Sequence, residues 1–188
     1  LILFNNNINL IYIGTFNNRQ LVDTVEGVSN FYLKYCHEYN ITYTIHGDGK
    51  ESEKNLIKLA IRNCNATSYV HLKGYINQSK INDVLIKNNV GISYVPIKNY
   101  YNHQPPTKTF EYLASGLVVL ATNTAANNDI IDINNGVLIE DTSKSFFKGL
   151  ELIVKRRKSY KSEEIKNSIS MFTWDKITNQ LHDILKEF

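Results

Sequence analysis

The sequence predicts an α/β fold, a doubly wound parallel sheet of about six strands with helices on both faces. Two observations predict it. Short apolar or β-branched runs alternate with segments whose apolar residues recur at helical spacing, and this alternation repeats along the 188 residues. Glycines also follow several of the runs, at the ends where such sheets bind ligands. A chain of this length suffices for one domain that buries roughly 70% of its unfolded surface.

The first half of the chain indicates three strands, each closed by a turn that contains glycine. Residues 9–16 (NLIYIGTF), 41–45 and 69–72 are short, apolar and rich in β-branched or aromatic side chains. The turns follow at Gly14, at Gly47 and Gly49, and at Gly74. Apolar residues at helical spacing predict helices over 20–39, 56–64 and 81–85.

The second half indicates three more strands, at 90–95, 117–120 and 136–139. We expect Asn127-Asn128 to cap a short helix through Ile130 and Ile131, and Thr142 or Ser143 to cap a longer one. Thr173 is the expected cap of a final helix over 173–188. That helix has an apolar face, formed by Trp174, Ile177, Leu181, Ile184 and Leu185.

The most informative stretch is 105–123, PPTKTFEYLASGLVVLATN. We expect Thr107 to cap a short helix whose apolar side carries Phe110, Leu113 and Ala114. The first amides of that helix would then lack intrahelical partners and form an anion site, to which Lys108 adds a full charge. Glu111, one turn further, would repel phosphate but accept hydrogen bonds from a sugar diol. A ligand with both phosphates and hydroxyls, such as a nucleotide, fits this arrangement.

Composition narrows the class of protein. The net charge of +3 is mild and gives no indication of nucleic-acid binding, and no apolar run approaches the ~20 residues that cross a bilayer. We expect Cys36 and Cys64 to be free thiols in a reducing cytoplasm. The five histidines show no ligand spacing, so we expect no metal. Because residue 1 is Leu, we expect a fragment in which 1–8 is the remnant of a linker.

A dinucleotide-binding oxidoreductase is one alternative for this layout. It needs G-x-G-x-x-G after the first strand, and this chain has Gly14 alone there. Gly47 and Gly49 follow the second strand without a third glycine. An NAD enzyme is therefore disfavoured.

The order of these pieces resembles the C-terminal, donor-binding half of a two-domain glycosyltransferase of the GT-B fold, and is most similar to glycosyltransferase family 4. The resemblance rests on HGDG after the second strand, LKGYI after the third and, above all, KTFEYLASGLVVLATN. It implies a Rossmann-like domain, covering 1–188, that binds a nucleotide-diphosphate sugar. It also implies transfer without a metal or other cofactor, usually with retention at the anomeric carbon.

The resemblance also implies roles for individual residues. Glu111 matches the second glutamate of the family's Glu-x7-Glu motif, which is implied to hold the ribose hydroxyls. Lys108, with the backbone of Thr107 and Thr109, matches the diphosphate site. Arg19, just past the turn at Gly14, matches loosely the basic residues that neutralise the leaving group. Gly74, Tyr75 and Ile76 match the segment whose backbone groups hold the nucleotide base in family members.

The chain departs from the family pattern at the first glutamate of the motif, where it has His103, and in the loop before the helix, which lacks Gly-Phe-Gly. His103 is either a contact to the donor sugar or an exposed loop residue. The change leaves the donor sugar and the stereochemical outcome open. The donor base, uridine or guanosine, is also open.

The acceptor, a glycan or a lipid-linked glycan in polysaccharide, capsule or lipopolysaccharide assembly, would bind an N-terminal domain absent from this chain. We therefore expect the fragment to bind donor but to transfer nothing alone. A sugar-nucleotide epimerase of the same architecture and a non-catalytic nucleotide-binding module remain alternatives. The basic run 155–158, with Lys161, is either a solvated helix end or a weak contact with the inner membrane face.

Overall fold

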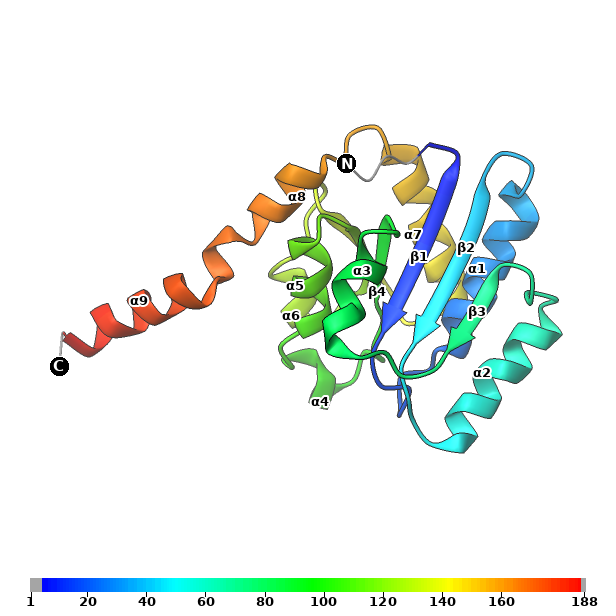
Figure 1. Ribbon diagram of the computed structural model, residues 1–188, viewed down its shortest axis with the longest axis horizontal. Helices are drawn as coiled ribbons and strands as arrows, with labels where there is room; N and C mark the ends of the chain where they lie inside the picture. The colour runs from blue at the N-terminus through cyan, green and yellow to red at the C-terminus, as the bar shows by residue number, and fades with distance from the viewer. Residues whose placement is uncertain (1–4, 187–188) are drawn as a thin grey trace.

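A computed structural model of the chain describes residues 5–186 and confirms the predicted α/β sheet (Figure 1). Six strands pair in parallel throughout, in the order β3-β2-β1-β4-β5-β6. Their bounds are β1 (Asn7–Ile13), β2 (Asn40–His46), β3 (Val70–Lys73), β4 (Val90–Ser93), β5 (Val118–Thr122) and β6 (Gly136–Ile139). The strands of the centre are buried on both faces, as the continuous apolar runs predict.

Helices cover both faces of the sheet (Figure 1). On one face lie α1 (Val22–Tyr35), α2 (Glu51–Asn63) and α7 (Ser143–Arg156), with α1 packed against the other two. On the other face lie α3 (Ile81–Leu85), which a 3₁₀ turn at Gln78–Lys80 precedes, and α5 (Thr107–Ala114). Two elements that the sequence pattern did not predict, α4 (Asn99–Asn102) and α8 (Ser162–Ser168), flank α5 on this side.

The strand order reverses beside β1, which pairs with β2 on one side and β4 on the other. The first three strands step outward from β1 in one direction, and β4 to β6 step outward in the other. In sheets of this topology the crevice outside the carboxyl ends of the two central strands is the usual ligand site. Gly14 follows β1 at that edge, and α4 and α5 follow β4 there.

Several predicted boundaries shift in the structure. The strand β1 begins at Asn7, so the predicted linker remnant overlaps its first two residues, while residues 1–4 lie outside the described part. The short helix α6 is Ala125–Asn128, and Thr124 caps it by accepting a hydrogen bond from the amide of Asn127. Asn127-Asn128 therefore end this helix rather than begin it. Thr142 caps α7, as predicted, through the amide of Ser145.

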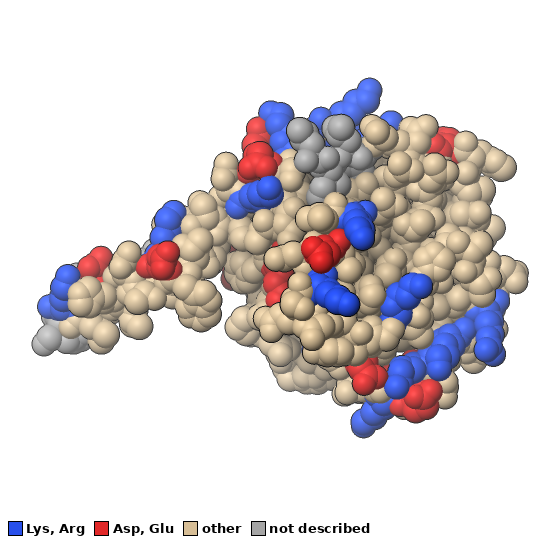
Figure 2. Space-filling view, viewed as in Figure 1, with Lys and Arg blue, Asp and Glu red and all other residues tan. Residues whose placement is uncertain are grey.

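The final helix, α9 (Trp174–Lys186), extends away from the sheet and its covering helices (Figure 1), and the space-filling view shows it projecting from the rest of the molecule (Figure 2). The apolar side chains predicted to form one face are all exposed to solvent, led by Trp174 at 82% and Leu185 at 63%. A 3₁₀ turn (Ser170–Phe172) precedes it, and there Phe172 packs on Phe110 of α5 at 5.1 Å between ring centroids. None of the helices within residues 5–186 has the length and hydropathy needed to span a bilayer.

Tyr112 joins α5 to the centre of the sheet. Its side chain is fully buried, and its ring lies against Gly91 of β4, where a Cβ would overlap the ring. Its phenol oxygen accepts a 2.9 Å hydrogen bond from the amide of Ile13, the last residue of β1. An unpartnered buried amide costs about 1–3 kcal/mol, so this bond matters more than its net strength suggests.

Replacing Tyr112 by Phe should keep the ring and leave the amide of Ile13 without its hydrogen-bond acceptor. We expect the free energy of unfolding to fall by about 1–3 kcal/mol, measured as a lower midpoint of urea denaturation with an unchanged slope. Tyr100→Phe is the matched control, because that side chain is 65% exposed and should tolerate the loss of its hydroxyl. Equal stability of the two variants would contradict the role of the Tyr112 phenol.

Candidate functional site

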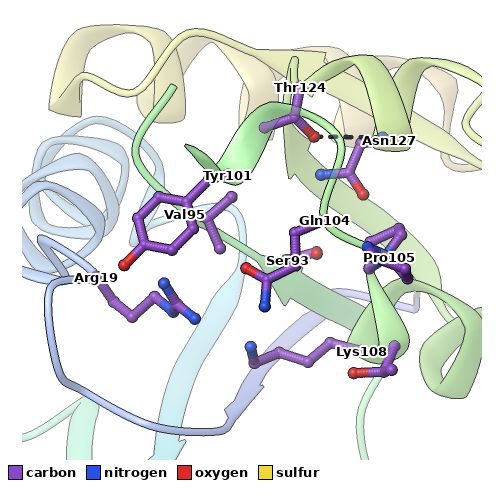
Figure 3. Close-up of a pocket in the computed structure, with 11 residues that line it drawn as sticks. Arg19, Ser93, Val95, Tyr101, Gln104, Pro105, Lys108, Thr124 and Asn127 are labelled. Carbon is purple, nitrogen blue, oxygen red and sulfur yellow. Dashed lines mark hydrogen bonds between the residues drawn. The ribbon is translucent and has the colours of Figure 1, made fainter. Parts of the chain in front are cut away.

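Two pockets open at the carboxyl edge of the sheet on either side of Lys108. The first, which we call the Arg19 pocket, has a volume of about 100 Å³ and lies between Arg19, Tyr101 and the start of α5 (Figure 3). The second, the Glu111 pocket, has a volume of about 430 Å³ and is bounded by the ends of β1 and β2, the loop after β3, and α5. Gly14 lines the Glu111 pocket, and the side chain of Lys108 lies across the same glycine.

Lys108 is held over the end of β1. A Cβ at Gly14 would overlap the lysine side chain, so the absence of a side chain there makes room for it. The ammonium lies 5.4 Å from the centroid of the Tyr12 ring. Burial and, to a lesser degree, the nearby charge of Arg19 together lower the pKa of Lys108 to about 8, while the charge of Glu111 acts in the opposite direction.

Arg19 reaches the same place from the loop that follows β1. Its guanidinium carbon lies 4.5 Å from the centroid of the Tyr101 ring. The Nε and Nη1 atoms are buried and have no hydrogen-bond partner among the described residues. Neither Arg19 nor Lys108 forms an ion pair with a carboxylate in the described part of the chain. Two adjacent cations without a counterion make a site for an anion.

The start of α5 differs from the prediction. Pro106, not Thr107, is the residue that precedes the helix, and its side chain offers no cap. The amide of Thr107 donates to the carbonyl of Pro105, and the amide of Thr109 donates to the carbonyl of Pro106. The amide of Phe110 donates to the same carbonyl, so the expected row of free amides is wrong at Thr107, Thr109 and Phe110. Positive charge here comes chiefly from side chains.

Thr109 was expected to contact the ligand through its backbone amide, which instead donates to Pro106, and its side chain is fully buried. Its hydroxyl lies 2.8 Å from Ser93 Oγ and 2.7 Å from Asn127 Oδ1, so it joins α5 to β4 and α6. The buried face of α5 is formed by Thr109, Tyr112 and Leu113, one position away from the predicted face. Thr107 remains exposed and lines the Arg19 pocket, together with the wall residues Pro106, Asn127 and Thr124.

Four predicted binding residues meet in the Glu111 pocket, namely Gly14, Tyr75, Ile76 and Glu111. Tyr75 is 79% exposed, so its ring is free to move over a ligand. Partial burial raises the pKa of Glu111, and the charge of Lys108 lowers it. Gly74 is not among the lining residues. Its carbonyl instead accepts a hydrogen bond from the amide of Gly47, which ties the loop after β3 to the end of β2.

His103 lies at the end of α4, exposed to solvent, and it lines neither pocket. The structure therefore does not bring the residue at the position of the first motif glutamate to the cations. The sequence also gave no sign of Tyr101, which occupies the wall opposite Lys108 (Figure 3). An aromatic residue in the loop between a buried strand and α5 was the only available signal. Within residues 5–186 no group of three His, Cys, Asp or Glu side chains is placed to hold a metal.

Comparison with known proteins identifies the family of this chain. Residues 7–156 match the family model described as glycosyl transferases group 1. No curated protein matches the sequence. Among solved structures, Anabaena Alr3699/HepE in complex with UDP superposes with a TM-score of 0.75 at 12% identity, over 97% of this chain and 50% of that chain.

Two further structures agree. The pneumococcal O-GlcNAc transferase GtfA, in complex with UDP and GlcNAc, has a TM-score of 0.74 at 19% identity, over 96% of this chain and 35% of that chain. The C-terminal domain of LpcC, a glycosyl transferase group 1 family protein from Francisella tularensis, has a TM-score of 0.71 at 16% identity, over 87% of this chain and 85% of that domain.

At these identities the structural likeness shows the fold alone. The chain spans half or less of the length of the Anabaena and pneumococcal proteins, and nearly the whole of the C-terminal domain. The narrower assignment to glycosyltransferase family 4 stays a prediction. Because the family model covers most of the sequence, the chain belongs to the group 1 glycosyl transferases, and its fold is that of the C-terminal, Rossmann-like half of a GT-B enzyme.

Proposed function

We propose that this chain binds the donor of a sugar-transfer reaction, a UDP- or GDP-linked sugar, and that a second domain binds the acceptor. The observation that carries the proposal is the pair of unneutralised cations, Arg19 and Lys108, beside a pocket that holds a carboxylate. A diphosphate supplies the missing counterion, and a nucleoside suits the larger Glu111 pocket. The Anabaena and pneumococcal proteins superposed above were solved in complex with UDP, which supports this choice of ligand.

The proposed chemistry is the management of charge. Breaking the bond between sugar and phosphate puts negative charge on the leaving diphosphate and positive character on the sugar. We propose that Lys108 and Arg19 neutralise the leaving group, without a resident metal or other cofactor, and that transfer retains the anomeric configuration. Fixed cations in a partly buried site stabilise such a transition state because they need no reorganisation as charge develops.

Glu111 is proposed to hold the ribose. It lines the pocket that Gly14 shares with Lys108, so a nucleotide whose phosphate meets Lys108 brings its pentose to the glutamate. Tyr75 and Ile76 line the far side of this pocket, where the base would lie. Thr107 and the Lys108 amide are proposed to contact the phosphates from the start of α5.

For the acceptor substrate and the cellular location we propose only a general class. We propose a glycan or lipid-linked acceptor in polysaccharide assembly. The support is WaaG, a glycosyltransferase involved in lipopolysaccharide biosynthesis, whose structure superposes on this chain. This chain alone should transfer nothing, and turnover of a UDP-sugar without acceptor would instead favour an epimerase.

At the basic end of α7, Arg157 already donates to the carbonyl of Val154 and lies over Tyr39. We propose a cytoplasmic protein whose remaining exposed cations contact anionic lipid weakly, which co-sedimentation with liposomes would measure.

The donor site predicts selective stabilisation by nucleoside diphosphates. UDP or GDP at a hundred times its Kd should raise the free energy of unfolding by about 2.7 kcal/mol, and NAD at the same concentration should not. Lys108→Met should weaken binding of the diphosphate by about ten- to a hundredfold, because a charge-assisted hydrogen bond of about 1.5–3 kcal/mol is lost. Lys155→Met, an exposed lysine at the opposite edge of the sheet, is the control and should bind like the wild type. Unaltered affinity of Lys108→Met would remove this residue from the site.

The lowered pKa of Lys108 predicts that donor affinity falls in mild alkali. Below pH 8 the free site is charged, whereas above pH 8 the diphosphate must bind together with a proton. The Kd for UDP should therefore be flat from pH 6.5 to 7.5 and then rise, approaching about tenfold per pH unit. Titration calorimetry across this range measures the effect. A Lys108→Met variant should show no rise, and a rise of equal steepness in that variant would assign the proton to another group.

The ribose role of Glu111 predicts a specific loss. Wild-type protein should bind UDP more tightly than 2′-deoxy-UDP, because the glutamate accepts hydrogen bonds from both ribose hydroxyls. Glu111→Gln should reduce the affinity for UDP by about tenfold and narrow its preference over the deoxy ligand. Glu38→Gln, an exposed change at the far end of α1, is the control. If the Glu111 variant keeps the full preference, another group reads the pentose.

A further inference from the structure

The guanidinium of Arg19 is positioned by an aromatic ring. Its central carbon lies 4.5 Å from the centroid of the Tyr101 ring, and two of its nitrogens are buried without a hydrogen-bond acceptor among the described residues. The phenol of Tyr12 interacts with Arg19 through a side-chain hydrogen bond, and a long flexible side chain with two unsatisfied nitrogens needs a further contact to order it. Figure 3 shows the Tyr101 ring beside the guanidinium, on the wall of the pocket away from Lys108. Attraction between a cation and a ring face provides that contact.

The ring of Tyr101 is itself held by two elements. It belongs to α4, whose turn is closed by the amides of Tyr101 and Asn102 donating to the carbonyl of Lys98. The next residue, Asn102, accepts a 2.8 Å hydrogen bond from the amide of Ala125 and so ties α4 to the start of α6. Tyr100 packs against Tyr101 with 4.4 Å between ring centroids. These bonds hold the backbone of α4 that carries the ring, and the ring itself packs against Tyr100.

A ring holds a cation without cancelling its charge. A carboxylate at the same distance would pair with Arg19 and compete with any anionic ligand. The quadrupole of a ring attracts the guanidinium but leaves its full charge available. Lys108 is placed in the same way, over the ring of Tyr12. The two cations of the site are thus both supported by tyrosines.

We propose that Tyr101 is a positioning residue that orients Arg19 toward the phosphate farther from the nucleoside, and so selects a nucleoside diphosphate over a monophosphate. This inference rests on the proposed function. The Glu111 pocket would hold the nucleoside, and Lys108 lies where the two pockets meet. Arg19 lies beyond Lys108, in the Arg19 pocket, so its charge reaches the second phosphate rather than the first.

The test compares UDP with UMP in the 188-residue chain. By titration calorimetry at pH 7, Tyr101→Leu should weaken UDP binding about three- to tenfold and leave the Kd for UMP unchanged. Tyr101→Phe keeps the ring and should restore the affinity for UDP. A role in general stability would weaken both ligands alike, and thermal denaturation of each variant identifies that case. Equal losses for UDP and UMP, or a Phe variant as weak as the Leu variant, would overturn the positioning role.

A double-mutant cycle then tests whether Tyr101 acts through Arg19. Arg19→Met alone should weaken UDP binding, and adding Tyr101→Leu to it should cause no further loss. Additive losses would show that Tyr101 acts independently of Arg19 and would overturn the proposal. Wild-type protein that binds neither UDP nor GDP would overturn the proposed function itself. Wild-type protein that binds UDP, with Tyr101→Leu unaffected, would overturn only the inference about Tyr101.

Discussion

One hydrogen bond sets the geometry on which the site depends, from the amide of Ile13 to the buried phenol of Tyr112. The donor is the last residue of β1, the strand beside which the strand order reverses, and the acceptor is in α5. The chain reaches Arg19 soon after that donor, and Lys108 stands one turn before that acceptor. This contact therefore fixes the start of α5, which carries Lys108, relative to the end of β1, from which the loop to Arg19 departs. Gly91 makes it possible, because any side chain in β4 at this point would displace the tyrosine ring.

The two cations have a further property in common, which is the absence of a carboxylate partner among the described residues. Tyr12 shows how the fold holds a cation without a carboxylate partner. Its phenol donates to the carbonyl of Thr15 at 2.6 Å, and its ring supports the ammonium of Lys108. Burial, and after it the like charge of Arg19, lower the pKa of Lys108, so the free protein holds this ammonium at a cost. An arriving anion relieves that repulsion, which adds to its own attraction.

The sheet was predictable from sequence because its strands are continuous apolar runs, whereas details of the site depend on neighbours that no local pattern contains. The residues before α5 are a case in point. The carbonyls of Pro105 and Pro106 accept hydrogen bonds from the amides that follow, so most of the amides expected to be free are already used. The burial of Thr109 was not predicted for a related reason. Its hydroxyl forms buried hydrogen bonds with Ser93 and Asn127, and a pattern of apolar residues does not reveal such a network. Glu111 lines the Glu111 pocket, because it lies on the face of α5 opposite the buried one, and its ribose role stays a prediction.

The extended position of α9 has a consequence for how this polypeptide behaves by itself. A helix of 13 residues is near the length at which isolated helices are marginal in water. Most helices gain their stability from an apolar face that packs against something, and here that face, including Trp174 and Leu185, is left in solvent. Its helical content must therefore vary with whether the face is covered. The fluorescence of Trp174, the one tryptophan in the sequence, would report that change directly.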